Sequence, residues 1–130
     1  MSDRSIKDAK TTVSKVFPAA AANDNTGTID LQVVGYKGEG YALNIAWPAL
    51  ANLVEAKTII FSVQDSADDI TYVAIGLTHT ITGGAGNGLA AGNVNLRLKA
   101  TTRRYVQVNR AVESGGGSNI ASTNTVALVY

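Results

Sequence analysis

The sequence predicts an all-β fold, an antiparallel β-sandwich. Three observations predict it: short stretches in which apolar and polar residues alternate, breaks rich in turn-forming residues between them, and 13 glycines in 130 residues. A period of two places one face of a strand in the core and the other in solvent. Seven or eight such stretches favour a sandwich or a barrel. We favour a jelly roll among these, while an immunoglobulin-like sandwich and an open barrel stay open, because the pattern does not give the strand order.

Residues 1–26 differ in composition from the rest and are interpreted as an extended N-terminal arm. Basic side chains are mixed there with a few apolar ones, and Pro18 and four alanines lead into a polar turn at 23–27. Chain termini are commonly weakly ordered unless they are docked. We therefore expect a weakly ordered arm before a single β-sandwich domain at 27–130. A strand or helix docked on the core is the alternative.

The first part of the domain contains four strand candidates and one further short one. Lys57–Gln64 has apolar residues on both faces, which predicts a central strand buried on both sides. The polar run Asp65–Asp69 then predicts a hairpin loop. The candidates are Ile29–Val33, Tyr41–Trp47, Lys57–Gln64, Ile70–Ile75 and, as the short one, Leu77–Thr82.

Pro48–Ala56 is the one helical candidate in the sequence, so the fold class includes at most one short helix. Leu50, Leu53 and Val54 have helical spacing, and Pro48 suits the first turn of a helix. The length of the segment allows a turn or two.

The last third of the chain, Val94–Tyr130, has the pattern of a scaffold. Val94–Lys99, Arg104–Asn109 and Thr125–Tyr130 each alternate between apolar and polar residues, and the Gly-rich break Glu113–Asn119 separates the last two. No acid, base and nucleophile come together in this region. We therefore expect a platform that presents surfaces and holds no reaction centre.

The overall composition argues against several classes of protein. Charged residues make up 16% of the chain, the net charge is +1, and cysteine is absent. A net charge this close to zero argues against nucleic-acid binding by the chain as a whole. The lack of cysteine excludes a disulfide framework and a thiolate zinc site. The apolar runs are too short to span a bilayer and we recognise no secretory leader, so we expect no membrane partner.

No candidate chemical site has a complete set of residues. His79 is the only histidine and has no orienting partner nearby in sequence, so we interpret it as structural. Asp65, Asp68 and Asp69 lack the ligand pattern of an EF-hand and are interpreted as a solvated hairpin loop, with a weak calcium site as the alternative. Gly86–Ala91 satisfies a relaxed dinucleotide pattern but precedes a strand instead of a helix. We therefore expect no enzyme, no cofactor and no metal.

Five basic residues lie around Tyr105 in a window without acidic residues. Basic residues mixed with an aromatic one can hold single-stranded nucleic acid. Strand alternation disperses these charges over both faces of a sheet, so we expect no direct nucleic-acid contact and interpret them as a solvated face or a patch for an acidic protein surface. The five are Arg97, Lys99, Arg103, Arg104 and Arg110.

Two segments resemble a known family of virion proteins. Phe61–Tyr72 looks like a hairpin common in small phage virion proteins, and so does Leu96–Val108 with the Gly-rich turn and apolar strand that follow. Together they are similar to the jelly-roll capsid cement (decoration) proteins of tailed bacteriophages, over roughly Thr28–Tyr130. The resemblance implies a structural, non-enzymatic homodimer or homotrimer on the outside of an icosahedral head, made in the host cytoplasm. It also implies that the protein bridges neighbouring capsomers of the major capsid protein and stabilises the capsid.

The arm is the candidate contact region for such a shell. We expect its basic side chains to meet acidic capsid surface and its apolar side chains to fill grooves, and an arm strand can pair with an exposed sheet edge. The candidate contact residues are Arg4, Lys7, Lys10, Val13, Lys15, Val16 and Phe17.

The alternative function is a ligand-binding β-sandwich module, for a carbohydrate or a receptor, on a phage or bacterial surface structure. Exposed aromatic side chains carry that kind of site. Trp47 lies in the apolar phase of its strand, so we expect it to pack in the core. The aromatic candidates are Tyr36, Tyr41, Trp47, Tyr72 and Tyr105.

Overall fold

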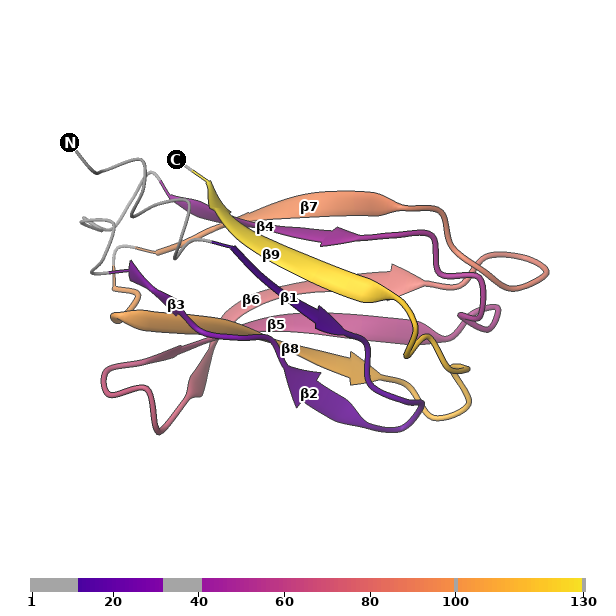
Figure 1. The fold of residues 1–130 in the computed structure, drawn as a ribbon, viewed down its shortest axis with the longest axis horizontal. Coiled ribbons are helices and arrows are strands. Elements are labelled where there is room, and N and C mark those ends of the chain that lie inside the picture. Colours follow the sequence, from indigo (N-terminus) through magenta and orange to yellow (C-terminus); the bar gives the residue numbers. More distant parts are fainter. Residues whose placement is uncertain (1–11, 32–40, 100, 130) are drawn as a thin grey trace.

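The computed structural model describes residues 12–31, 41–99 and 101–129, and their strands form two antiparallel sheets (Figure 1). We call them the smaller and the larger sheet. The smaller sheet has the strand order β1 (Thr12–Val16), β9 (Thr123–Val129), β4 (Ala42–Trp47), β7 (Gly92–Arg97). The larger sheet has the order β2 (Asn23–Asn25), β8 (Tyr105–Val112), β5 (Thr58–Ser66), β6 (Val73–Thr82), and β3 (Ile29–Asp30) also pairs with β8.

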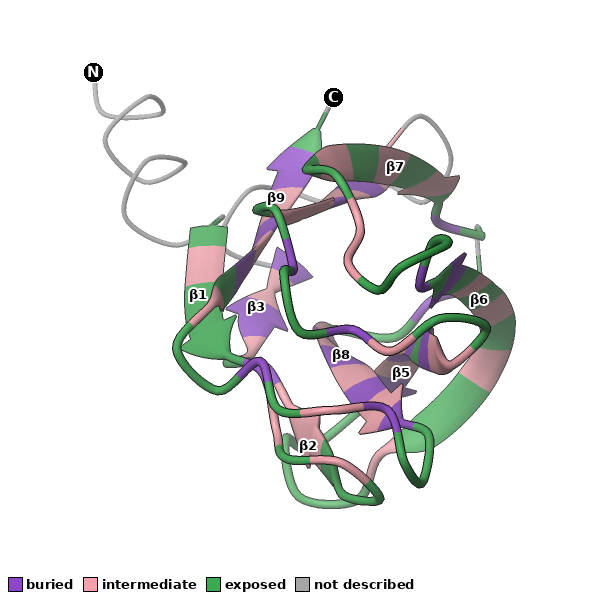
Figure 2. Cartoon of the chain, turned by 90° about the vertical axis from the view of Figure 1, so that its right-hand side faces the viewer, coloured by how far each residue is buried: buried purple, intermediate pink, exposed green. Residues whose placement is uncertain are grey.

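The two sheets lie face to face and confirm the predicted antiparallel β-sandwich. In the end-on view, buried residues alternate with less buried ones along β8 and β9 (Figure 2). The described part of the chain contains no α-helix, and hence none with the length and hydrophobicity of a membrane span. The chain crosses between the sheets after β1, β3, β4, β6, β7 and β8. This order is compatible with the jelly roll that the sequence analysis favours.

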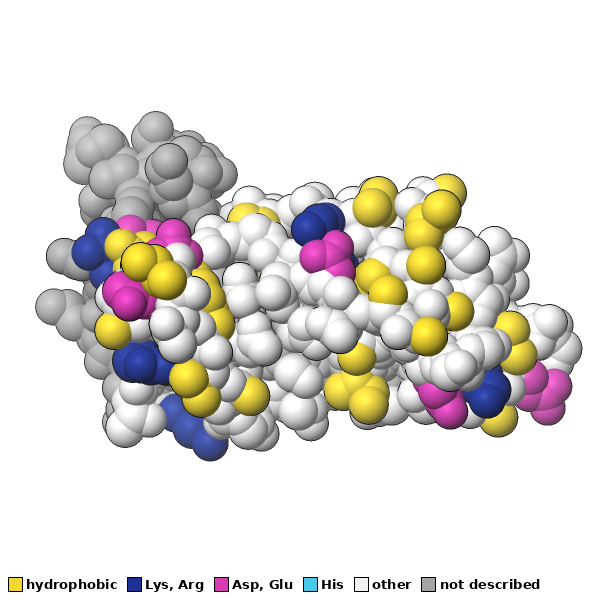
Figure 3. Space-filling model, turned by 90° about the horizontal axis from the view of Figure 1, so that it is seen from below, with side chains coloured by type: hydrophobic (Ala, Val, Ile, Leu, Met, Phe, Trp, Pro, Cys, Tyr) yellow, Lys and Arg dark blue, Asp and Glu magenta, His cyan; other side chains and the backbone are white. Residues whose placement is uncertain are grey.

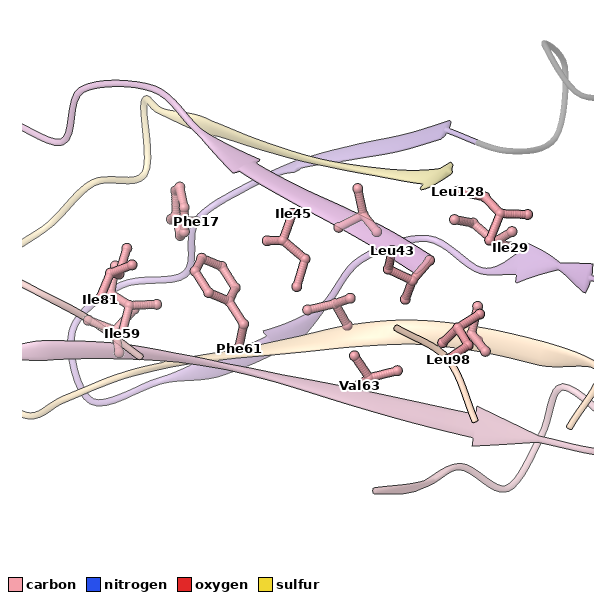
Figure 4. Close-up of a cluster of buried hydrophobic side chains, with 14 of the residues drawn as sticks. Phe17, Ile29, Leu43, Ile45, Ile59, Phe61, Val63, Ile81, Leu98 and Leu128 are labelled. Atoms are coloured by element: carbon pink, nitrogen blue, oxygen red, sulfur yellow. The ribbon is translucent and has the colours of Figure 1, made fainter. Parts of the chain in front are cut away.

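The core between the sheets consists of alternate residues of the strands. Phe61 and Val63 of β5 point toward Leu43 and Ile45 of β4, and all four are fully buried (Figure 4). Phe17 joins them, with its ring centroid 6.2 Å from that of Phe61. Full burial of one such side chain stabilises a fold by about 1.5–3 kcal/mol. The apolar layer therefore holds the two sheets together and leaves their outer faces free for other roles.

Most predicted strands coincide with observed ones. β4, β7, β8 and β9 match the alternating stretches of the sequence to within a few residues, because in each of them one phase of the alternation is more buried than the other. β3 covers the first two residues of the candidate Ile29–Val33, whose last two residues lie outside the described ranges. Tyr130 also lies outside them.

β5 lies between β8 and β6 in its sheet, but it is not buried on both sides. Ile60 points away from the core and is 39% exposed. No described strand covers the outer face of the larger sheet, so the prediction of two-sided burial is wrong. Ile60 produced the misleading signal, because an apolar residue in the polar phase of a strand looks like a second buried face.

β6 is one continuous strand where the sequence predicted two short ones, Ile70–Ile75 and Leu77–Thr82. The register with β5 shifts between Ser62 and Gln64, and Gly76 on β6 has a φ of 84°. Residues 75–77 of β6 stand there opposite the single residue Val63 of β5, so the irregularity absorbs two extra residues of β6 and lets the ladder continue, and glycine adopts the required φ without strain. Residues 70–72 belong to the hairpin loop.

The segment Pro48–Ala56 forms a loop, and the prediction of a short helix there is wrong. The Leu50 N–H donates to the Leu89 carbonyl at 2.8 Å, and the Leu89 N–H donates back at 3.1 Å. The Gly88 N–H donates to the Leu53 carbonyl at 2.7 Å. Leu50 and Leu53 are fully buried, so their spacing serves core packing from a loop. A helix of one or two turns has too little intrinsic stability to compete with these tertiary bonds.

The expected arm at 1–26 is docked on the sandwich from Thr12 onward. β1 pairs with β9 along its whole length, and β2 pairs with β8. Phe17, directly after β1, is 1% exposed. Burial of this aromatic side chain and pairing of β1 with β9 together offset the conformational entropy that the terminal segment loses on docking. Residues 12–26 are thus part of the sandwich, as in the docked-strand alternative, and residues 1–11 lie outside the described ranges.

Candidate interaction surface

The outer face of the larger sheet carries a continuous set of uncharged side chains, which we call the neutral face. In the view onto this side, charged side chains gather near the two ends and one further pair lies toward a long side (Figure 3). Strand alternation creates the face, because the neighbours of each buried residue point outward. Its members are Asn23 and Asn25 of β2, Gln107, Asn109 and Ala111 of β8, Thr58, Ile60, Ser62 and Gln64 of β5, and Ala74, Thr78, Thr80 and Thr82 of β6.

Side-chain amides of the neutral face are bonded across neighbouring strands. Gln107 Nε2 donates to Gln64 Oε1 at 2.8 Å. Asn109 Nδ2 donates to Asn25 Oδ1 at 2.9 Å and to Asn23 Oδ1 at 3.3 Å. Such cross-strand pairs hold the side chains in place before any partner arrives, so a partner loses less side-chain entropy on binding.

Three ion pairs frame the neutral face. Lys57 and Glu113 meet at 3.7 Å at one end, and Arg104 and Asp30 meet at 2.9 Å at the other. Along the side of β2, Lys15 Nζ lies 2.9 Å from Asp24 Oδ1, and this bond is the main cause that lowers the pKa of Asp24. Exposed pairs of this kind add little to stability. Their relevance here is that they balance the charge at the border of the face.

Ile60 lies in the middle of the neutral face. Its cross-strand neighbours are Thr80 on β6 and Ala111 on β8. At 39% exposure, it is an apolar side chain held at the surface among small hydroxyl and methyl groups. Single exposed apolar residues are common on proteins, so the exposure of Ile60 does not by itself indicate a contact site. The uncharged side chains around it make it a candidate contact residue.

The acidic run after β5 organises its own loop. Asp65 is buried, and Arg103 contacts it through Nη2 at 2.8 Å and through its backbone N–H at 2.9 Å. Asp68 Oδ1 accepts hydrogen bonds from the Thr71 and Ile70 amides, which lower the pKa of Asp68. The interpretation of a fully solvated loop is therefore wrong for Asp65.

No metal site is assembled from these carboxylates. Asp69 accepts a hydrogen bond from the Tyr72 hydroxyl, while Asp65 and Asp68 serve other partners. Burial, aided by the bond to Asp69, raises the pKa of Tyr72 to about 12. Within the described ranges, no group of three or more histidine, cysteine or acidic residues is placed to hold a metal ion.

The five basic residues around Tyr105 point in different directions, as predicted. Arg103 binds Asp65, and Arg104 binds Asp30 while its guanidinium lies 4.8 Å from the Tyr105 ring centroid. Arg97 is exposed on the outer face of the smaller sheet, and Lys99 Nζ donates to the Ile75 carbonyl. These four therefore do not form one basic surface.

Arg110, the fifth, is completely buried between the sheets. Its Nη2 donates to the Val16 carbonyl at 2.9 Å and its Nη1 to Asn124 Oδ1 at 3.1 Å. Asn124 Nδ2 in turn donates to the Ala46 carbonyl at 2.8 Å. Desolvation lowers the pKa of Arg110, and the nearby Asp24 opposes that effect. Sequence reasoning missed this link, although Arg110 shares its phase on β8 with Val106, Val108 and Val112.

Trp47 is half-buried and packs against the core, as predicted. Its ring lies nearly parallel to those of Phe61 and His79, with centroids 5.8 Å away in each case. Gly92 packs so closely against the indole that a Cβ at this position would lie 3.0 Å from the ring. Nε1 donates to the Ala90 carbonyl at 3.2 Å. Trp47 and His79 therefore have structural contacts, and the indole surface is largely occupied by the protein itself.

The predicted shell-contact residues have different positions in the structure. Phe17 lies in the core, so the expectation that it fills a groove of a partner is wrong. Val16 is 46% exposed, Val13 is half-buried, and Lys15 is engaged with Asp24. The other three, Arg4, Lys7 and Lys10, lie outside the described ranges. Tyr36 of the aromatic candidates does too.

No family model and no curated protein sequence matches this chain. Among solved structures, the enzymatically active domain of tailspike protein 4 of bacteriophage CBA120 is similar with a TM-score of 0.47 and 17% identity, over 87% of this chain and 14% of that chain. A family 16 carbohydrate-binding module-2 is similar with a TM-score of 0.39 and 14% identity, over 86% of this chain and 73% of that chain. At these values, the similarity concerns the β-rich architecture and says nothing of activity or ligand.

Proposed function

We propose that the chain is a non-catalytic structural protein of a bacteriophage head, which binds the capsid exterior and bridges neighbouring capsomers of the major capsid protein. The observation that carries this proposal is the neutral face, an uncharged outer face suited to protein–protein contact. Depletion of charged side chains is characteristic of the centre of protein–protein contacts. The resemblance in sequence to capsid cement proteins supplies the class of partner. In this proposal the protein needs no cofactor and contacts neither nucleic acid nor membrane.

We place the contact with the shell itself at the outer edge of β1. Among the described strands, only β9 pairs with β1, so β1 is an edge strand of the smaller sheet. An unpaired strand edge can add a strand from another protein. Val16 is exposed there, and the basic residues Arg4, Lys7 and Lys10 precede the strand in sequence. These residues and Lys15 are the proposed contacts with acidic shell surface.

The experiment is co-sedimentation of the full chain with assembled shells of the phage that encodes it. We expect near-stoichiometric copy number relative to the shell protein. Removal of residues 1–11 should keep the fold, because β1 begins at Thr12, and should abolish shell binding. A deletion through Phe17 is unsuitable, since it removes β1 and a core residue. Absence of the full chain from the shells contradicts the proposed function, and unchanged binding of the shortened chain contradicts the role of residues 1–11.

A ligand-binding module for neutral sugars is the second candidate function. The observation that favours it is an amide cluster on the smaller sheet, in which Asn44 Nδ2 donates to Asn93 Oδ1 at 3.0 Å and to Asn95 Oδ1 at 2.9 Å. The remaining amide groups there can bind hydroxyls. The occupied surface of Trp47 counts against it. A reproducible hit on a glycan array, together with no shell binding, would favour the module.

A further inference from the structure

We infer that the neutral face is the docking surface for a second copy of this chain, related to the first by a two-fold axis close to Ile60. The starting point is the distribution of charge. The chain contains 21 charged residues, as 11 basic plus 10 acidic, yet none of the outward side chains of the neutral face is among them. Acidic and basic side chains border the face and are paired within the chain.

The chemistry of the neutral face makes it complementary to itself. A two-fold contact brings the same patch of both copies together, so any unbalanced charge would meet its like. Amides and hydroxyls both donate and accept hydrogen bonds, so Thr80 and Gln107 can pair with the same residue types of a second copy. The framing ion pairs lie at the border, where they add no net repulsion.

Ile60 gives the face an apolar centre. In a two-fold pair with its axis near β5, the two Ile60 side chains meet and lose their exposure to water. Anchors of this kind contribute most when they lie at the middle of a contact and are surrounded by groups that exclude water. Thr80 and Ala111, the cross-strand neighbours of Ile60, are in position to do so.

The size of the face predicts a weak dimer. Four strands about 4.8 Å apart, with about six residues of about 3.3 Å rise each, give a flat footprint of roughly 400 Å² per copy. Stable contacts bury about 800 Å² of accessible surface per partner, so this face reaches about half of that value and has the size of a weak, transient contact. We expect a dissociation constant on the order of micromolar. Because the smaller sheet lies on the opposite side of the sandwich, pairing leaves the β1 edge of both copies free.

The first test is analytical ultracentrifugation of the full chain from about 1 to 200 µM, a range that covers weak specific contacts. The unchanged protein should convert from monomer to dimer over this range. Thr80→Lys on β6 should stay monomeric throughout, since it places like charges across the two-fold. Thr123→Lys is the matched control, an exposed threonine on the outer face of the smaller sheet, and should dimerise normally. A monomer at all concentrations, a trimer, or equal behaviour of the two variants would overturn the inference.

A second measurement keeps the inference testable if Thr80→Lys does not fold. The chain contains no cysteine, so single-cysteine variants report one position each. Ile60→Cys should form an intermolecular disulfide under mild oxidation, and Thr123→Cys should react much more slowly. Equal rates would contradict a two-fold axis near Ile60. Both measurements use the chain without shells, so their failure is distinct from failure of the proposed function.

Discussion

Replacing Arg110 by alanine should lower the free energy of unfolding by about 4 kcal/mol. The guanidinium has two good hydrogen bonds, to the Val16 carbonyl at 2.9 Å and to Asn124 Oδ1 at 3.1 Å. Two longer bonds, at 3.4 Å, reach the Lys15 and Asp24 carbonyls. Each buried acceptor left without its donor costs about 1–3 kcal/mol, so the two good bonds give roughly 2–6 kcal/mol. Relief from burying a cation offsets a part of this cost.

The assay is urea unfolding followed by the fluorescence of Trp47, the only tryptophan, combined with hydrogen exchange on β1. For a chain of this size, a loss of about 4 kcal/mol corresponds to a fall in Tm of roughly 10–20 °C. Exchange should speed up first in Thr12–Val16, because two of the lost bonds hold carbonyls of that strand. The matched control is Arg104→Ala, whose pair with Asp30 is half-exposed and should cost at most about 1 kcal/mol.

Equal losses of stability in the two arginine variants would contradict the role of the buried guanidinium, and the account fails with them. It also fails if β1 keeps its protection in Arg110→Ala, since the buried guanidinium would then not hold β1 against the larger sheet. A large loss of stability with unchanged exchange on β1 would place the effect in the core around Phe17, whose ring centroid lies 5.7 Å from the guanidinium carbon.

Three further predictions concern pH and backbone geometry. The lowered pKa of Asp68 means that its carboxylate stabilises the fold above its ordinary pKa of 3.8 and that this contribution is lost as the pH falls through the folded value. Asp68→Asn should therefore flatten the acid side of a plot of Tm against pH. The pKa of Tyr72 is raised to about 12, so the neutral phenol stabilises the fold below its ordinary pKa of 10 and ceases to do so as the pH rises toward 12. Tyr72→Phe should remove the last tyrosinate step from an ultraviolet titration, and an unchanged step would contradict the assignment. Gly117→Ala should cost at least about 3 kcal/mol in urea unfolding, because its Cβ would lie 2.0 Å from the Asn52 carbonyl oxygen, whereas Gly86→Ala, with a similar φ and open space, should cost only about 1 kcal/mol. Equal losses of stability in the two glycine variants would mean that the positive φ alone sets the cost, without a contribution from the clash with Asn52.

The strand ladder was largely predictable from the sequence. β4 and β8 follow from alternation, because each buries one phase and exposes the other. The prediction of a helix at Pro48–Ala56 was wrong, because the same spacing of leucines occurs in a helix and in a loop that long-range hydrogen bonds hold against the core. The division of β6 into two strands was wrong, because Gly76 looks like a break between strands in the sequence, whereas it lies in a bulge of β6 through which the strand continues. Such features depend on residues far away in the sequence, which a local pattern does not contain.

The candidate surface was predictable in part. The neutral face can be found by reading the outward phase of each strand, but its unity depends on the strand order, which alternation does not give. The burial of Arg110 had a usable signal, since it occupies an inward position between Val108 and Val112. The local sequence contains no signal for the burial of Phe17, because that burial depends on the pairing of β1 with β9.

The pairing of β1 with β9 has a consequence for folding of the chain during its synthesis. Thr12 lies opposite Ala127 in the ladder, so the first described strand finds its partner only after the last one has been synthesised. Loop closure over such a separation in sequence is slow, and sandwiches of this kind typically fold in milliseconds to seconds. Until then, the Phe17 side of the core stays open to water in the nascent chain. The sandwich therefore closes only after residues 123–129 have been synthesised, and before that stage aggregation through exposed core side chains competes with folding.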